Sequence, residues 1–324
     1  MTDSPLILAV PSKGRLQENA AAFFARSGLV FTQSRGARDY RGTLAGVPNV
    51  EVAFLSASEI VSQLASGAAH LGITGEDLIR EQVPDADEAV ELLTPLGFGH
   101  ANVVVAVPQA WIDVRTMADL DEVAADIRAR HGYKMRVATK YVNLTRRFFA
   151  EKGIADYRIV ESLGATEGAP GAGSAELIVD ITTTGATLTA NALKVLDDGV
   201  MLRSEANLVA STRAPWTDRA LEAATTVLAR IAAEEEARAS REVRAAIDPA
   251  QASSLPILAQ ELGASLPYGV PQGREAVLHC PAAAVFETVA ALQGIGARDI
   301  TVRTFDYLFR PTNPLTERLL RRLG

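Results

Sequence analysis

Short apolar runs alternate with longer amphipathic runs over the first two-thirds of the chain, and this alternation limits the possible folds more than any other feature. Runs such as Leu6–Val10 and Val103–Val107 have the length and composition of buried strands. Between them lie runs with helical spacing, such as Leu16–Ser27 and Met117–Arg130. Strands that alternate with helices predict parallel sheets covered by helices, which is the α/β class.

The positions of these runs are compatible with one large sheet or with two smaller lobes. The expected strands are Leu6–Val10, Val50–Leu55, Leu71–Thr74, Val103–Val107, Met135–Thr139, Arg158–Glu161, Leu177–Ile181 and Ala206–Ala210. The expected helices are Leu16–Ser27, Ala57–Ser66, Glu76–Gln82, Met117–Arg130, Leu144–Lys152 and Leu188–Asp198. Turn-forming residues between Thr94 and Val103 indicate a crossing between the lobes, and the strand that follows Met201 is expected to return to the first lobe.

The amino-acid composition of the sequence changes at Trp216. Residues from Thr217 to about Arg244 are rich in alanine, glutamate and arginine, which predicts a long and mostly solvated helix. The rest is expected to form a small α+β unit. Its expected strands lie near Val243–Ile247, Ala276–Cys280 and Ile300–Phe305, and its expected helices are Ala250–Leu262 and Ala282–Gly294.

Composition excludes several classes of function. A formal net charge of -7 over 324 residues argues against a general nucleic-acid or membrane-surface role. The only cysteine, Cys280, rules out an intramolecular disulfide, and no cysteine and histidine cluster has zinc spacing. The chain shows neither a basic leader nor an apolar run long enough for a membrane span, so a soluble cytoplasmic protein is expected.

One segment combines a buried strand, a threonine-rich loop and a helix start. In Asp180-Ile-Thr-Thr-Thr-Gly-Ala-Thr-Leu188, the residues from Thr182 to Thr187 follow the strand directly. Such loops bind anions, and Gly185 lets the backbone curl around a phosphate. Asp180 is a suitable acceptor for sugar hydroxyls, so the segment suits a 5-phosphoribosyl group. An ordinary turn with a threonine cap remains the alternative.

The longer segment from Glu167 to Leu188 closely resembles the signature of ATP phosphoribosyltransferase, the family that catalyses the first step of histidine biosynthesis. The stretches Pro11–Leu16, Leu71–Leu78 and Ala138–Phe148 resemble the same family. The resemblance implies a two-lobed core like that of periplasmic binding proteins. It also implies the long form of the family, in which a small ferredoxin-like C-terminal domain binds histidine.

The resemblance assigns functions to the parts of the chain. Residues 1–95 are expected to form the first catalytic lobe, completed by about residues 190–215. Residues 96–189 would form the second lobe, which carries the phosphoribosyl-binding loop. Residues 216–324 would form a C-terminal domain for regulation and oligomerisation.

The resemblance and the local patterns together predict the site residues. The expected catalytic residues are Asp180, Glu167, Lys13 and Arg15. The 5-phosphate is expected on Thr182, Thr183, Thr184, Gly185, Ala186 and Thr187. ATP is expected to contact Arg15, Leu16, Gly75, Glu76 and Asp77. The leaving diphosphate needs further cations, for which Arg35 and Arg38 are candidates.

The implied reaction transfers the 5-phosphoribosyl group of 5-phosphoribosyl diphosphate (PRPP) to N1 of ATP. Mg²⁺ would be bound mainly through the diphosphate, histidine would inhibit, and the chain would form a homo-oligomer, either a hexamer or a dimer. Two alternatives are a two-lobed solute-binding protein and a phosphoribosyltransferase with another acceptor. The lack of an export signal argues against the first, and the single acid before the loop, Asp180, argues against the second.

Overall fold

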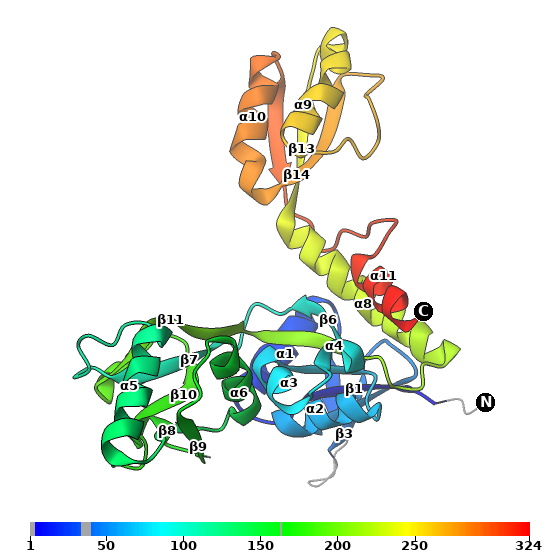
Figure 1. Cartoon of the computed structure of the whole chain (residues 1–324). Helices are drawn as coiled ribbons and strands as arrows, with labels where there is room; N and C mark the ends of the chain where they lie inside the picture. The colour runs from blue at the N-terminus through cyan, green and yellow to red at the C-terminus, as the bar shows by residue number, and fades with distance from the viewer. Residues whose placement is uncertain (1–3, 34–39, 163) are drawn as a thin grey trace.

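The structure is a computed structural model that describes residues 4–33, 40–162 and 164–324. Within these residues the chain forms three sheets. Two sheets build adjoining lobes, and the third lies at the far end of the long helix α8 (Asp218–Ala239) (Figure 1). The two-lobed α/β architecture expected from the sequence is confirmed.

The first lobe is built on a sheet whose central strands are parallel. In spatial order its described strands are β2 (Phe31–Gln33), β3 (Arg41–Leu44), β4 (Val50–Leu55), β1 (Leu6–Pro11), β5 (Leu71–Gly75), β12 (Ala206–Ser211) and β6 (Val90–Pro95). Strand β1 pairs in parallel with β4 and β5, an arrangement that needs long connections. The helices of these connections are α1 (Gly14–Arg26) and α2 (Ala57–Ser66), while α3 (Glu76–Gln82) and α4 (Ala86–Ala89) lie between β5 and β6.

The second lobe is built on a mixed sheet. In spatial order its described strands are β11 (Leu193–Ser204), β7 (Ala101–Pro108), β10 (Leu177–Thr182), β8 (Met135–Thr139) and β9 (Tyr157–Glu161). Strands β10, β8 and β9 are parallel, while β7 pairs antiparallel with β10 and β11. Its helices are α5 (Met117–His131), α6 (Val142–Glu151), the 3₁₀ turn η1 (Thr166–Gly168) and α7 (Ala186–Ala190).

The helix expected over Leu188–Asp198 is wrong. Helix α7 ends at Ala190, and the chain then enters the long strand β11. Leu188, Leu193 and Leu196 are all buried, which gave the sequence its apparent helical spacing. The register of β11 against β7 shifts between Val195 and Val200, and this bulge removes the alternation by which a strand is recognised.

The helix expected over Thr217–Arg244 is shorter and more buried than predicted. Helix α8 ends at Ala239, and one face of its first half packs into the core of the first lobe. The residues on that face are Ala220, Ala223, Ala224, Val227, Leu228 and Ile231. The C-terminal helix α11 (Pro314–Leu323) returns beside α8 and adds Leu315 and Leu319 to the same core (Figure 1). A cut at residue 216 therefore runs through this core.

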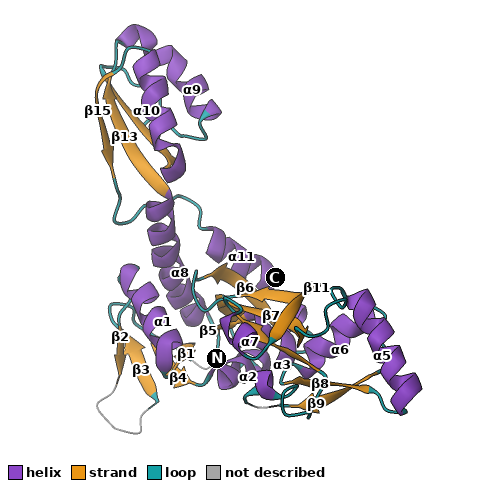
Figure 2. Ribbon diagram, turned by 90° about the vertical axis from the view of Figure 1, so that its left-hand side faces the viewer, coloured by secondary structure: helices purple, strands orange, loops and turns teal. Residues whose placement is uncertain are grey.

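The third sheet belongs to the C-terminal unit. Its described strands are β14 (Glu275–Pro281), β13 (Ser240–Ala246) and β15 (Arg298–Arg303), all antiparallel. Its helical segments are η2 (Pro249–Ser254), α9 (Leu255–Glu261), η3 (Ala282–Ala284) and α10 (Val285–Gly294), and Figure 2 shows α9 and α10 on one side of the sheet. An isolated bridge from Ser265 to His279 takes the position that a second strand has in a ferredoxin-like sheet.

The lengths and hydropathies of the helices bear on membrane association. In the ranges that the structure describes, none of the helices combines the length and apolar character needed to span a bilayer.

Candidate active site

The chain crosses between the lobes twice, over residues 96–100 and at residue 205. The carboxyl ends of the parallel strands in both lobes adjoin these two crossovers. In the first lobe, Gly75 at the end of β5 pairs with Ala206. In the second lobe, Thr182 at the end of β10 pairs with Asn102. Ala206 and Asn102 lie at the starts of β12 and β7, just after the two crossovers. Ligands of α/β proteins bind outside the carboxyl ends of strands, so this junction is the candidate active site.

The threonine-rich loop lies at this junction. Gly185 has a φ of +76°, and the main-chain N–H of Gly185 donates to Oγ1 of Thr182 over 2.9 Å. The hydroxyl of Thr183 donates to the carbonyl of His100 in the crossover, over 2.9 Å. Thr184 and Thr187 are exposed. The loop is thus tied to the crossover at one point, and the exposed Thr184 and Thr187 are accessible to a ligand.

Asp180 lies at the base of this loop with two charged neighbours. Parallel pairing of Val179 with Thr139 places the next residue of each strand, Asp180 and Lys140, side by side. Burial raises the pKa of Asp180, the charge of Lys140 lowers it, and the carboxylate of Glu167 raises it further. Glu167 lies in η1, which packs against β10. The structure therefore brings together the two predicted acids and a lysine that the sequence reasoning did not assign to the site.

The pH dependence of the reaction should reflect the pair of acids. The raised pKa of Asp180 means that its carboxylate becomes protonated at a higher pH than that of an ordinary aspartate, and the protonated form accepts hydrogen bonds less well. Glu167→Gln removes a neighbouring negative charge and so lowers the pKa of Asp180. We expect the acid limb of kcat/KM for the expected substrate PRPP to move to lower pH. Glu122→Gln, an exposed position on α5, should leave the limb in place; a limb that Glu167→Gln does not move would contradict this coupling.

Lys13 and Arg15 lie at the carboxyl end of β1, at the start of α1. Both side chains are exposed, and neither forms a hydrogen bond or ion pair with another described residue. Two unpaired cations at the positive end of a helix are unfavourable without an anionic ligand. Leu16 differs from them, because it packs on the core of the first lobe and lies 3.4 Å from the Cβ position of Gly99 in a crossover.

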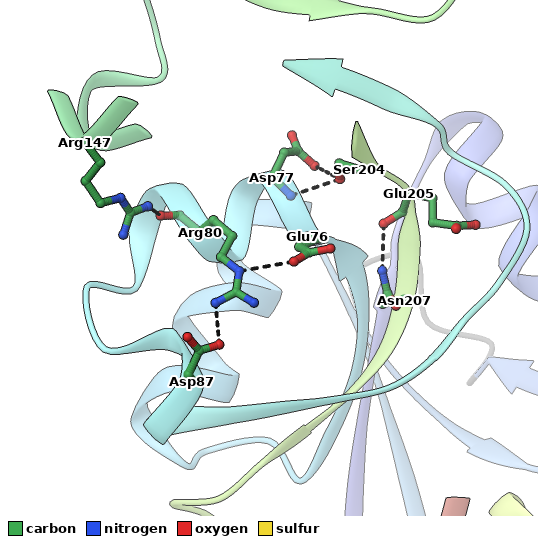
Figure 3. Close-up of polar contacts among 8 residues, drawn as sticks. All are labelled: Glu76, Asp77, Arg80, Asp87, Arg147, Ser204, Glu205 and Asn207. Carbon is green, nitrogen blue, oxygen red and sulfur yellow. Dashed lines mark hydrogen bonds and ion pairs between the residues drawn. The ribbon is translucent and has the colours of Figure 1, made fainter. Parts of the chain in front are cut away.

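The loop after β5 forms a joint between the lobes. Asp77 is 6% exposed, and its carboxylate accepts hydrogen bonds from the Tyr141 hydroxyl at 2.7 Å and the Ser204 hydroxyl at 2.9 Å. Figure 3 shows Asp77 turned toward Ser204, while Glu76 turns toward Arg80. Gly75 has no room for a side chain, since a Cβ there would lie 2.3 Å from Oδ1 of Asp77.

Tyr141 is the partner of Asp77 from the second lobe. Burial and the charge of Asp77 raise the pKa of the Tyr141 phenol, so it remains a hydrogen-bond donor. Tyr141 is 1% exposed. Sequence reasoning did not find this contact, although Lys140 and Tyr141 come directly after the buried strand β8 and so lie at a carboxyl end.

The candidate cations for the leaving diphosphate are only partly placed. Arg35 and Arg38 lie outside the described residues. Arg41, three residues after Arg38, lies on β3 and forms an ion pair with Glu51 of β4.

Comparison with known proteins identifies what this chain is similar to. A family model described as ATP phosphoribosyltransferase matches residues 56–233. An ATP phosphoribosyltransferase from Afipia carboxidovorans is 59% identical over 322 residues, covering 99% of this chain and 99% of the relative. One from Nitrobacter winogradskyi is 60% identical over 320 residues, covering 98% of each. A solved ATP phosphoribosyl transferase (HisG:HisZ) complex from Thermotoga maritima aligns at 25% identity with a TM-score of 0.54, covering 70% of this chain and 95% of that chain.

Proposed function

The chain belongs to the ATP phosphoribosyltransferase family, and we propose that its site joins C1 of PRPP to N1 of ATP and releases diphosphate. The enzyme is a pentosyltransferase, and this reaction is the first step of histidine biosynthesis. The observation that carries the proposal is the placement of Asp180, beside Lys140 and directly before the loop Thr182–Thr187, at the junction of the lobes.

Each group then has a role that follows from its position. The loop Thr182–Thr187 binds the 5-phosphate through hydroxyls and main-chain N–H groups, and Asp180 accepts hydrogen bonds from the ribose hydroxyls. Lys13 and Arg15 approach from the first lobe and bind phosphate oxygens of the substrates. Departure of diphosphate leaves positive charge on the ribose ring, which Asp180 and Glu167 stabilise. Catalysis consists of positioning and charge, without a covalent nucleophile.

The carboxylates of the site fit a magnesium ion that the substrate brings. In the described ranges, no group of three or more histidine, cysteine, aspartate or glutamate side chains is placed to hold a metal ion. Mg²⁺ usually takes one or two protein carboxylates together with substrate phosphates, and Asp180 and Glu167 can supply them. When bound, Mg²⁺ would neutralise the charge of the departing diphosphate.

The proposed function is tested by diphosphate release. Purified protein is mixed with PRPP and Mg²⁺, and ATP, adenine and orotate are compared as acceptors. We expect diphosphate release only when ATP is the acceptor, and we expect phosphoribosyl-ATP as the second product. Release with adenine or orotate instead would indicate another phosphoribosyltransferase, and PRPP or ATP binding without turnover would indicate a solute-binding protein.

Histidine is proposed as the inhibitor, and the C-terminal unit as its binding site. The same unit supports assembly into a homo-oligomer, a hexamer or a dimer, because it exposes large apolar side chains. Phe286 is 86% exposed, Tyr268 75% and Ile257 65%. A cytoplasmic location is proposed on the ground that the buried Cys280 forms no disulfide.

The regulatory proposal is tested by deleting the third sheet and its helices while leaving the hydrophobic core of the first lobe intact. Because Glu242 of β13 lies opposite Arg303 of β15, the chain enters and leaves this unit at adjacent points, and a short glycine-serine linker can replace residues 240–305. We expect this variant to keep turnover and to lose inhibition by histidine, as measured by diphosphate release. Equal inhibition of both proteins would place histidine at the active site. Truncation near Ala214 is unsuitable, since it strips α8 and α11 from the first core.

A further inference from the structure

Helix α6 of the second lobe begins without a cap of its own. Its N-cap residue, Tyr141, makes no capping side-chain hydrogen bond, and its first turn holds no acidic residue. The first main-chain N–H groups of a helix need acceptors. They find one in Glu81, which belongs to α3 of the first lobe. Its carboxylate accepts from the N–H of Asn143 at 3.0 and 3.1 Å and from that of Leu144 at 2.9 Å.

The contact is reciprocal. Where α3 ends, the carbonyl of Glu81 accepts a hydrogen bond from Nδ2 of Asn143 over 3.0 Å. The carbonyl of Arg80 accepts one from Arg147, whose side chain reaches across to α3 in Figure 3. The negative end of α3 and its carboxylate thus meet the positive end of α6, which is favourable for both helices. Five hydrogen bonds cross between the lobes at this place.

Glu81 and Asp77 act on the same turn of chain. They are four residues apart on α3 and therefore lie on one face of this helix. Asp77 holds the Tyr141 hydroxyl, and Glu81 holds the main chain at Asn143 and Leu144. The turn that leads into α6 and is held by these hydrogen bonds starts at Lys140. The ammonium of Lys140 lies 5.0 Å from the centre of the Tyr141 ring.

This turn is linked directly to the proposed ribose site. Lys140 follows β8 and Asp180 follows the paired residue of β10, so a shift of the α6 turn moves the lysine relative to the acid. Asp180 faces two further ionisable groups, Glu167 on η1 and the phenol of Tyr141. Lys140 is the cation in this group, and its distance from Asp180 and Glu167 decides how far its charge offsets the repulsion between the two carboxylates.

We propose that Glu81 is a positioning residue for phosphoribosyl transfer: from the first lobe it caps α6 of the second lobe and thereby holds Lys140 beside Asp180. This inference rests on the proposed function. Glu81 touches no substrate and acts through the backbone of residues 143 and 144.

The test is a double-mutant cycle on kinetics. Glu81→Gln keeps the size of the side chain but removes its charge, and Lys140→Met removes the ammonium. We expect Glu81→Gln to raise KM for PRPP about tenfold while KM for ATP changes less than about twofold. In the Lys140→Met background, Glu81→Gln should have little further effect. Additive effects of the two changes on kcat/KM, or unchanged KM for PRPP, would overturn the proposal.

The control separates positioning from stability. Asp119 accepts main-chain N–H groups of Arg115 and Thr116 at the start of α5, also in the second lobe. Asp119→Asn should lower the melting temperature, as we also expect for Glu81→Gln, without raising KM for PRPP. A rise in KM for Asp119→Asn as large as for Glu81→Gln would show that loss of stability alone explains the effect. If the wild-type protein releases no diphosphate, the proposed function fails, and the same cycle on PRPP affinity by calorimetry still decides the role of Glu81.

Discussion

Asp180→Asn is expected to lower kcat/KM for PRPP by about 100-fold while the protein stays folded. The amide keeps the shape of the side chain but loses the charge that faces Lys140, the charge that we propose stabilises the developing positive charge on ribose. Because burial already disfavours a charge at this place, the substitution should not lower the melting temperature. Initial rates of diphosphate release at varied PRPP, with saturating ATP and Mg²⁺, measure the effect.

A matched substitution separates this effect from a general change of charge. Asp121 is exposed on α5 of the same lobe, and Asp121→Asn should keep wild-type rates. Wild-type kinetics for Asp180→Asn as well would mean that Asp180 only completes an ordinary turn, in which its carboxylate accepts the neighbouring N–H of Ile181 at 2.8 Å.

Gly185→Val is expected to have the larger effect, a loss on the order of 10³-fold in kcat/KM for PRPP. Gly185 has a φ of +76°, a conformation that valine adopts only with strain, so the loop should open and lose its alignment of phosphate donors. No protein atom lies within 4 Å of the Cβ position, so the added side chain projects into the open space where we propose that the 5-phosphate binds.

Gly153→Val provides the control for backbone strain. Gly153 follows α6, has a φ of +78° and likewise has no atom within 4 Å of its Cβ position. Both variants should lose a similar stability of about 1–2 kcal/mol, measured by denaturant unfolding, because the strain is of the same kind. Only Gly185→Val should lose PRPP affinity, as measured by calorimetry. Equal PRPP affinity in both variants would remove the loop from the phosphate site.

Sequence patterns predicted the parts of the fold that depend on local chain properties. The strands from Leu6 to Val10 and from Val103 to Val107 are buried runs, and the structure places β1 and β7 over them. The strand–loop–helix order around Thr182 was also predicted, since turn chemistry and a strand end are properties of neighbouring residues. Strands β2, β3 and β6 were missed because their sequences are short or mixed in polarity.

Contacts between distant residues explain the remaining differences. The sequence of helix α8 predicts a solvated helix because much of its buried face consists of small alanines. Only the packing of the helix on the first sheet shows that this face is buried. Helix α11 was missed because its two core leucines, Leu315 and Leu319, are buried only through contacts of the helix with the distant elements β6 and α8.

The candidate site shows the same division. Asp180 and the loop after it were found from adjacent residues. The hydrogen bonds of Asp77 and Glu81 to the start of α6, in contrast, join positions that are at least 62 residues apart. The N-cap position of α6 is Tyr141, and the acceptor for the first N–H groups of the helix comes from the other lobe. No pattern within α6 itself reveals this.

The most direct test of the account is a crystal structure of the wild-type protein with PRPP and Mg²⁺. The account predicts the 5-phosphate within hydrogen-bonding distance of the Thr182–Thr187 loop, the ribose hydroxyls on Asp180, and the diphosphate directed toward Lys13 and Arg15. A 5-phosphate bound at Lys13 and Arg15 instead, with the threonine loop free, would contradict it.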